Sequence, residues 1–263
     1  MAFLRYEDCA LKINNSGIQA SSVEFSMSAS VQAERVEDGT ILQDYNGNDR
    51  YGATSPLKGN LSINYLMDEN FENFFDVFNI SEDQVSARFA GIEISGMYLV
   101  GMDFSVEPFQ QVPIQLNFDV YGPISAPDSL VESNISVSPS DIKHLNGAVS
   151  YIDGPGIDGK IDHVTNFSYG AQLNRTPSFH IGEEVPERVT IDSIEVNASV
   201  KGNKFGDELS VNGNRAELNV VLSGIYGSYS KTFGCTGVIH SNNLSNSSDG
   251  FAQGSISVKQ VYR

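Results

Sequence analysis

The chain has 263 residues, a formal net charge of −17 at pH 7, 40% hydrophobic residues and 19% charged residues. This length corresponds to one large domain or two modest ones, with enough apolar residues to form cores. The negative charge argues against a protein that holds DNA or RNA, or that binds an anionic membrane surface, because both need a basic face. It does not argue against DNA that passes nearby without being bound.

The cysteines and the first residues show no pattern of a disulfide framework, a metal site or a targeting segment. Cys9 and Cys235 are the only cysteines, and they form neither a disulfide framework nor a CxxC metal pair. The first residues lack a basic segment followed by an apolar one, and no apolar run reaches the roughly 20 residues of a membrane-spanning helix. We therefore expect a protein made in a cytoplasm, with no signal peptide and no membrane partner.

Alternating apolar and polar residues predict β-strands over most of the chain. The first predicted strand, 23–31, places Val23, Phe25 and Met27 on one side and Glu24 on the other. Such alternation puts one side of a strand against a core and the other side on a polar surface. The further predicted strands are 61–65, 114–121, 167–173, 189–200, 216–222 and 255–262.

One segment has helical spacing instead. Asp68 is suited to cap a helix, and Phe71, Phe74, Phe75 and Phe78 follow at i, i+3, i+4 and i+7. Such a phenylalanine stripe is typical of a helix that covers a sheet, and we prefer that interpretation to a ligand site.

The chain resembles itself once. Residues 25–31, Phe-Ser-Met-Ser-Ala-Ser-Val, align with 167–173, Phe-Ser-Tyr-Gly-Ala-Gln-Leu, at an offset of 142 (167 − 25). Matches in the same order favour a duplicated domain. The two further matches are the Gly-to-Pro segments 52–56 and 182–186, and the Val-Tyr pairs 120–121 and 261–262.

The repeat and a Gly- and Pro-containing segment after residue 121 divide the chain. We expect a first domain at 1–124, a linker at 125–144 and a second domain at 145–263. The predicted fold class is all-β, with two tandem copies of a small antiparallel β-sandwich or barrel, the first with a flanking α-helix.

We find no candidate catalytic residue, cofactor site or metal site. The four histidines are scattered, no G-x-S-x-G motif occurs, and no glycine loop suited to phosphate is present. Residues 44–49 imitate the start of a calcium loop, but Asp49 stands where an EF-hand needs Gly and Ser55 where it needs Glu. A turn at the tip of a hairpin is the better interpretation.

The segment 166–177, Asn-Phe-Ser-Tyr-Gly-Ala-Gln-Leu-Asn-Arg-Thr-Pro, followed by Gly182 and 186–188, Pro-Glu-Arg, resembles the tail tube proteins of long-tailed bacteriophages. The order of strand, long hairpin, return strand, helix and further strands is similar too. The resemblance covers most of both halves, and its motifs are short. The first half departs from it by Gln-Ala-Glu at 32–34 and by a longer hairpin.

The resemblance implies a structural virion protein with no enzymatic activity. Six such domains form a ring, so a duplicated chain would form a trimeric, pseudo-hexameric ring, and stacked rings would make the tail tube. The implied partners are other copies of the chain, other tail proteins and DNA that passes transiently through the lumen. The implied location is the virion tail, assembled in the host cytoplasm.

Two sets of residues are candidates for these contacts. We expect the long hairpin, about 32–58, to reach the next ring, and carboxylates on the polar sides of the strands to line the lumen and repel DNA. The hairpin-tip candidates are Asp44, Tyr45, Asn46, Asn48, Asp49 and Arg50. The lumen candidates are Glu24, Asp119, Asp192 and Glu195.

Other functions remain open at this point. One is another virion part on the same fold, such as a tail terminator, a distal tail protein or a head-decoration protein. A different class is a carbohydrate-binding or adhesive β-sandwich tandem, which the absence of Trp and of an export signal disfavours.

Overall fold

The computed structural model of the protein describes a defined set of residues, to which the structural statements refer. They are 11–14, 16–18, 20–29, 31–33, 35, 40–41, 43, 46–48, 51–53, 58–67, 84–89, 92–125, 145–153, 157–159, 162–181, 183, 185–204, 215–224, 230–245 and 253–262.

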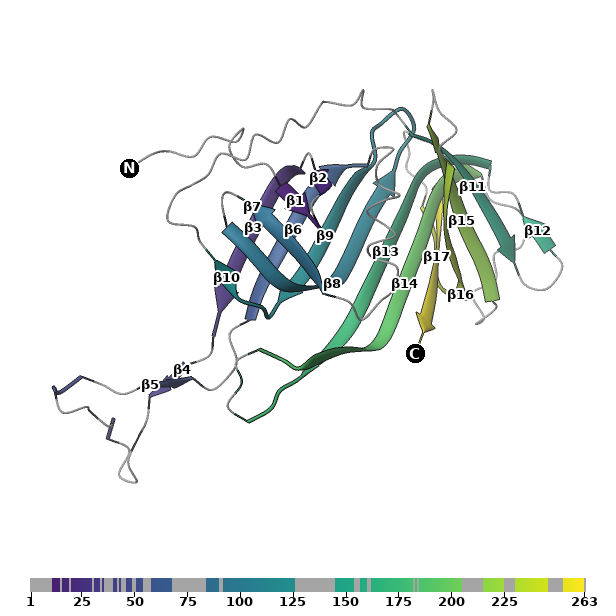
Figure 1. Ribbon diagram of the computed structural model, residues 1–263. Helices are drawn as coiled ribbons and strands as arrows, with labels where there is room; N and C mark the ends of the chain where they lie inside the picture. Colours follow the sequence, from purple (N-terminus) through teal and green to yellow (C-terminus); the bar gives the residue numbers. More distant parts are fainter. Residues whose placement is uncertain are drawn as a thin grey trace.

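These residues form β-strands and turns, and no helix occurs among them, so the all-β class is confirmed (Figure 1). The strands before residue 126 are β1 (Leu11–Ile13), β2 (Ser16–Ile18), β3 (Ala20–Ser28), β4 (Val31–Ala33), β5 (Tyr51–Ala53), β6 (Lys58–Leu66), β7 (Val85–Phe89), β8 (Ile92–Val106), β9 (Pro113–Val120) and β10 (Ile124–Ser125). The later strands are β11 (Leu145–Asp153), β12 (Ile157–Gly159), β13 (Asp162–Ser178), β14 (Arg188–Lys204), β15 (Arg215–Gly224), β16 (Ser230–Ser245) and β17 (Gln253–Tyr262).

Fifteen of the strands belong to one antiparallel sheet, and β4 and β5 pair separately. The earlier strands lie in the order β3-β6-β9-β8-β7-β1-β2, and the later ones in the order β13-β14-β17-β16-β15-β11-β12. With each set numbered along the chain, both orders read 3-4-7-6-5-1-2. The two sets therefore have the same connectivity, apart from β4 and β5, inserted between β3 and β6, and the short β10.

The register of the strands supports one sequence match and corrects another. Phe25 faces Leu61, which faces Phe118, and Phe167 faces Val200, which faces Ile256. The match of 25–31 with 167–173 thus places like residues in corresponding strands. The match between the Val-Tyr pairs is wrong. Val258, two residues after Ile256, takes the place of Val120, while Val261 lies three residues further along.

The two sets of strands are joined edge to edge by β8 and β13. Phe167 faces Val106 at one end of this pairing, and Gln172 faces Gly101 at the other. Residues of β8 up to Met97 pair with β7 instead, so β8 exchanges one neighbour for another along its length. We call the β8–β13 pairing the seam; Figure 1 shows it crossing the middle of the sheet.

The larger of two hydrophobic clusters among the described residues lies on one side of the sheet and continues across the seam, in a sandwich-like arrangement. A smaller cluster forms around Tyr98, Tyr121 and Val189. Phe104 of β8 packs against Phe233 of β16 at 4.7 Å and against Tyr169 of β13 at 5.3 Å between ring centroids. Burial raises the pKa of Tyr169 to about 12. Pulling the two sets of strands apart would expose these rings, so the seam depends on packing as well as on backbone hydrogen bonds.

Several expectations fall on residues outside the described set. The predicted helix at Asp68 and 71–78 and most of the linker, 126–144, are among them. The long hairpin is described in part: β4 pairs with β5, and Figure 1 shows the pair lying away from the main sheet.

A close approach of two glycines bends the chain where β8 meets β10. Gly96 has a φ of 63°, and a Cβ there would lie 2.6 Å from the backbone nitrogen of Gly122. The register of β7 against β8 shifts at the same place, between Val85 and Ala87. A β-bulge with a left-handed residue fits this geometry, and glycine alone meets both demands.

We predict that Gly96→Ala lowers the free energy of unfolding by about 2–4 kcal/mol, from the positive φ together with the steric overlap. Urea denaturation followed by circular dichroism measures the change. Gly101→Ala on the same strand is the control, because a Cβ at Gly101 would meet the flexible Asn117 side chain at 3.4 Å. Equal losses in the two variants would show that the glycine contact at β8 and β10 is not required.

Candidate functional site

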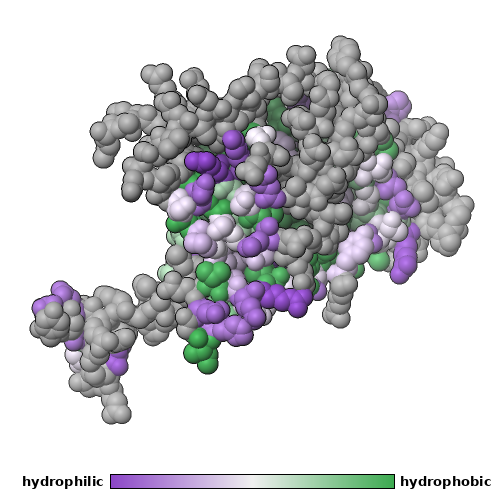
Figure 2. All heavy atoms as spheres, viewed as in Figure 1, coloured by the Kyte–Doolittle hydropathy of each residue, from purple (hydrophilic) through white to green (hydrophobic). Residues whose placement is uncertain are grey.

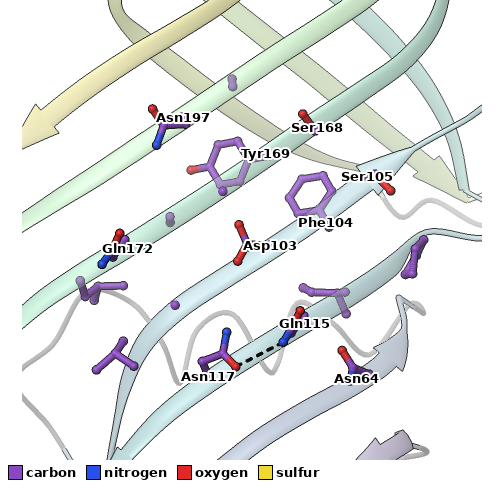
Figure 3. Close-up of a pocket in the computed structure, with 18 of the residues that line it drawn as sticks. Asn64, Asp103, Phe104, Ser105, Gln115, Asn117, Ser168, Tyr169, Gln172 and Asn197 are labelled. Carbon is purple, nitrogen blue, oxygen red and sulfur yellow. Dashed lines mark hydrogen bonds between the residues drawn. The ribbon is translucent and has the colours of Figure 1, made fainter.

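A concavity of about 980 Å³ lies over the side of the sheet opposite the larger hydrophobic cluster. Residues of β3, β6, β9, β8, β13, β14, β17 and β16 line it, so it extends across the seam from one set of strands to the other. Figure 3 shows side chains from both sets directed into the same space. The labelled polar residues of Figure 3 are Asn64, Asp103, Ser105, Gln115, Asn117, Ser168, Gln172 and Asn197.

Period-two alternation explains this surface. On β9, Ile114, Leu116 and Phe118 are buried in the core, which turns Gln115 and Asn117 to the opposite side. The same holds for β14, where Val196, Ala198 and Val200 are buried in the core. The concavity is therefore the polar side that the sequence pattern predicted, seen over many strands together.

Amides and hydroxyls of this side bond to one another across the strands. Gln115 donates to Ser62 Oγ at 3.2 Å and to Asn117 Oδ1 at 3.4 Å, the bond drawn in Figure 3. The hydroxyls of Ser168 and Ser199 lie 3.1 Å apart. Side chains that are paired in this way leave fewer strong donors for a passing ligand.

Two carboxylates on the polar side are paired with lysines. The Lys58 ammonium lies 2.7 Å from Asp119, and Lys259 lies 2.7 Å from Glu195. Burial lowers the pKa of Lys58, but the hydrogen bond and the charge of Asp119, with smaller contributions from Tyr121, outweigh it and raise the pKa above 10.5. Lys58 therefore stays protonated beside Asp119 at neutral pH.

The four lumen candidates occupy different environments. Asp119 lines the concavity but is 8% exposed and bound to Lys58. Glu195 on β14 forms an ion pair with Lys259 of β17, and Glu24 is exposed on β3. Asp192, near the start of β14, accepts a hydrogen bond from Thr176. Of the four carboxylates, Asp119 and Glu195 are thus paired with lysines.

The hairpin-tip candidates are described only in part. Asp44, Tyr45, Asp49 and Arg50 lie outside the described residues. Asn46 and Asn48 flank Gly47, whose φ of 82° is typical of a turn.

Exposed apolar side chains occur at opposite ends of the sheet. Phe109, in the turn between β8 and β9, has a φ of 62° and is fully exposed. Ile181 and Val185, between β13 and β14, are exposed as well. Because β8 and β13 are antiparallel neighbours, the turn after β8 and the turn after β13 point in opposite directions. Figure 2 shows hydrophobic side chains beside hydrophilic ones along the lower rim of the main body.

Sequence reasoning missed Asp103, which lies at the seam and lines the concavity. Its carboxylate crosses the face of Gly170 on β13, where a Cβ would come within 2.5 Å of Asp103 Oδ1. Burial raises the pKa of Asp103 above 3.8, although the residue keeps an exposed surface. The only sequence feature that marks this site is the pairing of Asp103 with Gly170, and it can be recognised only once β8 and β13 are known to pair.

No protein-family model matches the chain, and a search of curated proteins finds no match. Within the described residues, no helix has the length and apolar character needed to cross a membrane. The same residues contain no group of three or more His, Cys, Asp or Glu side chains placed to hold a metal ion.

We predict that Asp103→Asn raises the melting temperature at pH 7, because the amide keeps the shape and removes a charge that burial disfavours. The pKa of Asp103 in the folded protein lies above its value of 3.8 in the unfolded chain. At pH values above both pKa values, the ionised carboxylate therefore destabilises the fold. The gain should shrink as the pH falls toward about 2.5, where both states are protonated. Thermal melts at the two pH values measure it.

Glu24→Gln provides the control, since Glu24 is exposed on the same side of the sheet and a surface charge contributes little to stability. A lower melting temperature for Asp103→Asn at pH 7 would mean that the carboxylate is favourable where it lies.

Proposed function

We propose that the protein is a non-enzymatic structural virion protein, built from two copies of one domain, that self-assembles into stacked rings forming a bacteriophage tail tube. Three chains would supply the six domains of a pseudo-hexameric ring. Its partners would be other copies of itself and other tail proteins, with viral DNA passing through the lumen.

The observation that carries this proposal is the shared strand order on the two sides of the seam. Two sets of strands with the same connectivity lie edge to edge in one sheet. If each set is one copy of a domain, the seam is a domain-to-domain junction within the chain. A junction of this kind can be repeated between chains. Ring closure would then remove the exposed sheet edges that otherwise favour uncontrolled pairing.

The concavity supports a role as a passage for DNA. It extends over both sets of strands, and neutral amides and hydroxyls predominate among its polar residues. A channel that conducts DNA must offer few fixed cations, because each phosphate contact slows the polymer. The overall negative charge of the chain would repel DNA, and the lining of the lumen by Glu24, Asp119, Asp192 and Glu195 stays a prediction.

The two ends of the sheet support stacking. Phe109 at one end, and Ile181 and Val185 at the other, offer apolar contacts that differ between the ends. The hairpin of β4 and β5 follows β3 at the Ile181 end. Different surfaces at two ends produce head-to-tail growth, which builds filaments when it does not close on itself.

We predict that the purified chain forms tubes in negative-stain electron microscopy, and that deletion of Gln43–Arg50 leaves single rings. The deletion removes the tip of the hairpin without touching the main sheet, so ring formation should survive and stacking should fail.

A variant with a Gly-Ser segment of equal length in place of 43–50 separates the effect of length from that of sequence. Tubes formed by both altered chains would show that the tip is not the contact between rings. Single rings from the intact chain would instead favour a tail terminator, and the absence of any ring would refute the proposal.

We further predict that Gln172→Lys combined with Asn197→Lys makes the tubes retain linear double-stranded DNA. Both residues are exposed in the concavity, on β13 and β14, so the two lysines would supply phosphate contacts there. Retention should fall steeply between about 50 and 200 mM salt, as counterion release requires. Co-sedimentation of DNA with the tubes measures it.

Thr232→Lys combined with Thr236→Lys adds the same charge at exposed positions of β16 outside the concavity. Equal retention by both double variants would show that DNA retention does not depend on the concavity. No retention by the concavity variant would mean that the concavity is not the passage.

A further inference from the structure

We propose that a second copy of this chain pairs its β3 with the last part of β16, in the register that the seam sets within the chain. This inference rests on the proposed self-assembly and names the strands and residues that carry it. In the described part of the sheet, β3 has one hydrogen-bonded neighbour, β6. Beyond Val238, the described neighbour of β16 is β17.

The strand β3 corresponds to β13. Both are the third strand of their set, and both begin the order 3-4-7-6-5-1-2. Phe25 and Phe167 occupy matching register positions, which gives an offset of 142 (167 − 25). Gly170, which takes part in the seam, therefore corresponds to Ser28.

The strand β16 corresponds to β8. Each exchanges neighbours along its length, β8 at Met97 and β16 at Val238, and each has a register shift shortly afterwards, against β9 and β17 respectively. Burial fixes the alignment, because Met97 and Ile239 both face the core. Met102, which faces Leu116, then corresponds to Leu244, which faces Gly254. Asp103 corresponds to Ser245.

Exposed apolar side chains mark these two edges. Met102 is 4% exposed next to the seam, whereas its counterpart Leu244 is 74% exposed. Phe167 is 1% exposed, whereas its counterpart Phe25 is partly exposed and the next core-facing residue of β3, Met27, is 38% exposed. Leu244 and Met27 thus lack the cover that a neighbouring strand gives to the seam residues. A second copy of the same sheet has the shape to supply it.

The seam specifies the pairing between chains. Gly170 faces Asp103 and Ala171 faces Met102 within the chain. Replacing each residue by its counterpart pairs Ser28 with Ser245, and Ala29 with Leu244 of the other copy. This register puts Ser28 and Ser245 on the polar side and Leu244 on the core side, as alternation demands.

The contact is heterologous, since β3 of one copy meets β16 of the next. Contacts of this type produce rings when the rotation closes. The concavity already curves across the seam from β3 to β16, so an equivalent curvature at each new junction brings the last copy back to the first.

Disulfide formation between chains tests the register. Ser28→Cys and Ser245→Cys are introduced together in a Cys9→Ser background, and Cys235 remains in the core. Directly opposed residues of antiparallel strands lie about 4.5–5.5 Å apart between Cα atoms, within the range of a disulfide. We expect mild oxidation of the assembled protein to convert the monomer band of a non-reducing gel into covalent dimers and trimers.

Two matched variants control for proximity and oxidation. Ser28→Cys with Ser241→Cys keeps the same side of the strand but shifts the pair by four residues, roughly 13 Å along the strand. It should remain monomeric on the gel. Ser105→Cys with Ser168→Cys joins residues that face each other within the seam, so it should lose its free thiols without forming dimers.

The outcomes separate this inference from the proposed function. Rings or tubes in the microscope together with cross-linking in the shifted pair, or in neither pair, would overturn the register while leaving self-assembly intact. Protein that remains monomeric in the microscope and on the gel would overturn both. Covalent trimers from the Ser28 and Ser245 pair alone would establish the contact.

Discussion

Backbone N–H and C=O groups along a strand edge require partners, and this requirement governs the whole molecule. The strand β8 satisfies it with β7 along its first part and with β13 along its last part. Because β8 changes neighbours, the two sets of strands join into one sheet rather than forming two separate bodies. The continuous core below the seam and the concavity above it both follow from this single pairing.

The two sides of the sheet differ in character: one is packed with apolar side chains, and the other presents polar side chains. On the core side, aromatic rings such as Phe104 and Phe233 fix the distance between the strands by close contact. On the polar side, residues such as Ser168 and Gln115 bond to neighbouring hydroxyls and amides, which gives a surface on which neutral polar side chains predominate. A surface of this type can face a polyanion without gripping it. The net charge of the chain acts at longer range and does not need to be concentrated there.

Local pattern predicted the regular strands well, since β3, β6 and β9 overlap the predicted segments 23–31, 61–65 and 114–121. It failed at β8 and β16, where the alternation is broken by bulges and by glycines. A Cβ at Gly234 or Gly237 would collide with Asn219 or with the backbone of Lys259, so packing demands glycine where strand propensity disfavours it. The seam could not be predicted either, because its partners are far apart in sequence. Parity placed Asp119 on the polar side, but only the fold brings Lys58 beside it.

The stacked rings of Phe104 and Tyr169 at the seam have a consequence for how assembly would proceed. The counterpart of Tyr169 at the proposed junction between chains is Met27, so this position carries no second aromatic ring there. Aromatic pairs contribute about 0.5–1.5 kcal/mol beyond their buried area, so the junction inside the chain is the stronger of the two. Covalent connection also gives that junction a high effective concentration, whereas the other depends on how much protein is present. In the proposed ring, every second junction would therefore form as the chain folds. The weaker junctions between chains could open and re-form, which would let a misplaced subunit leave before the ring closes.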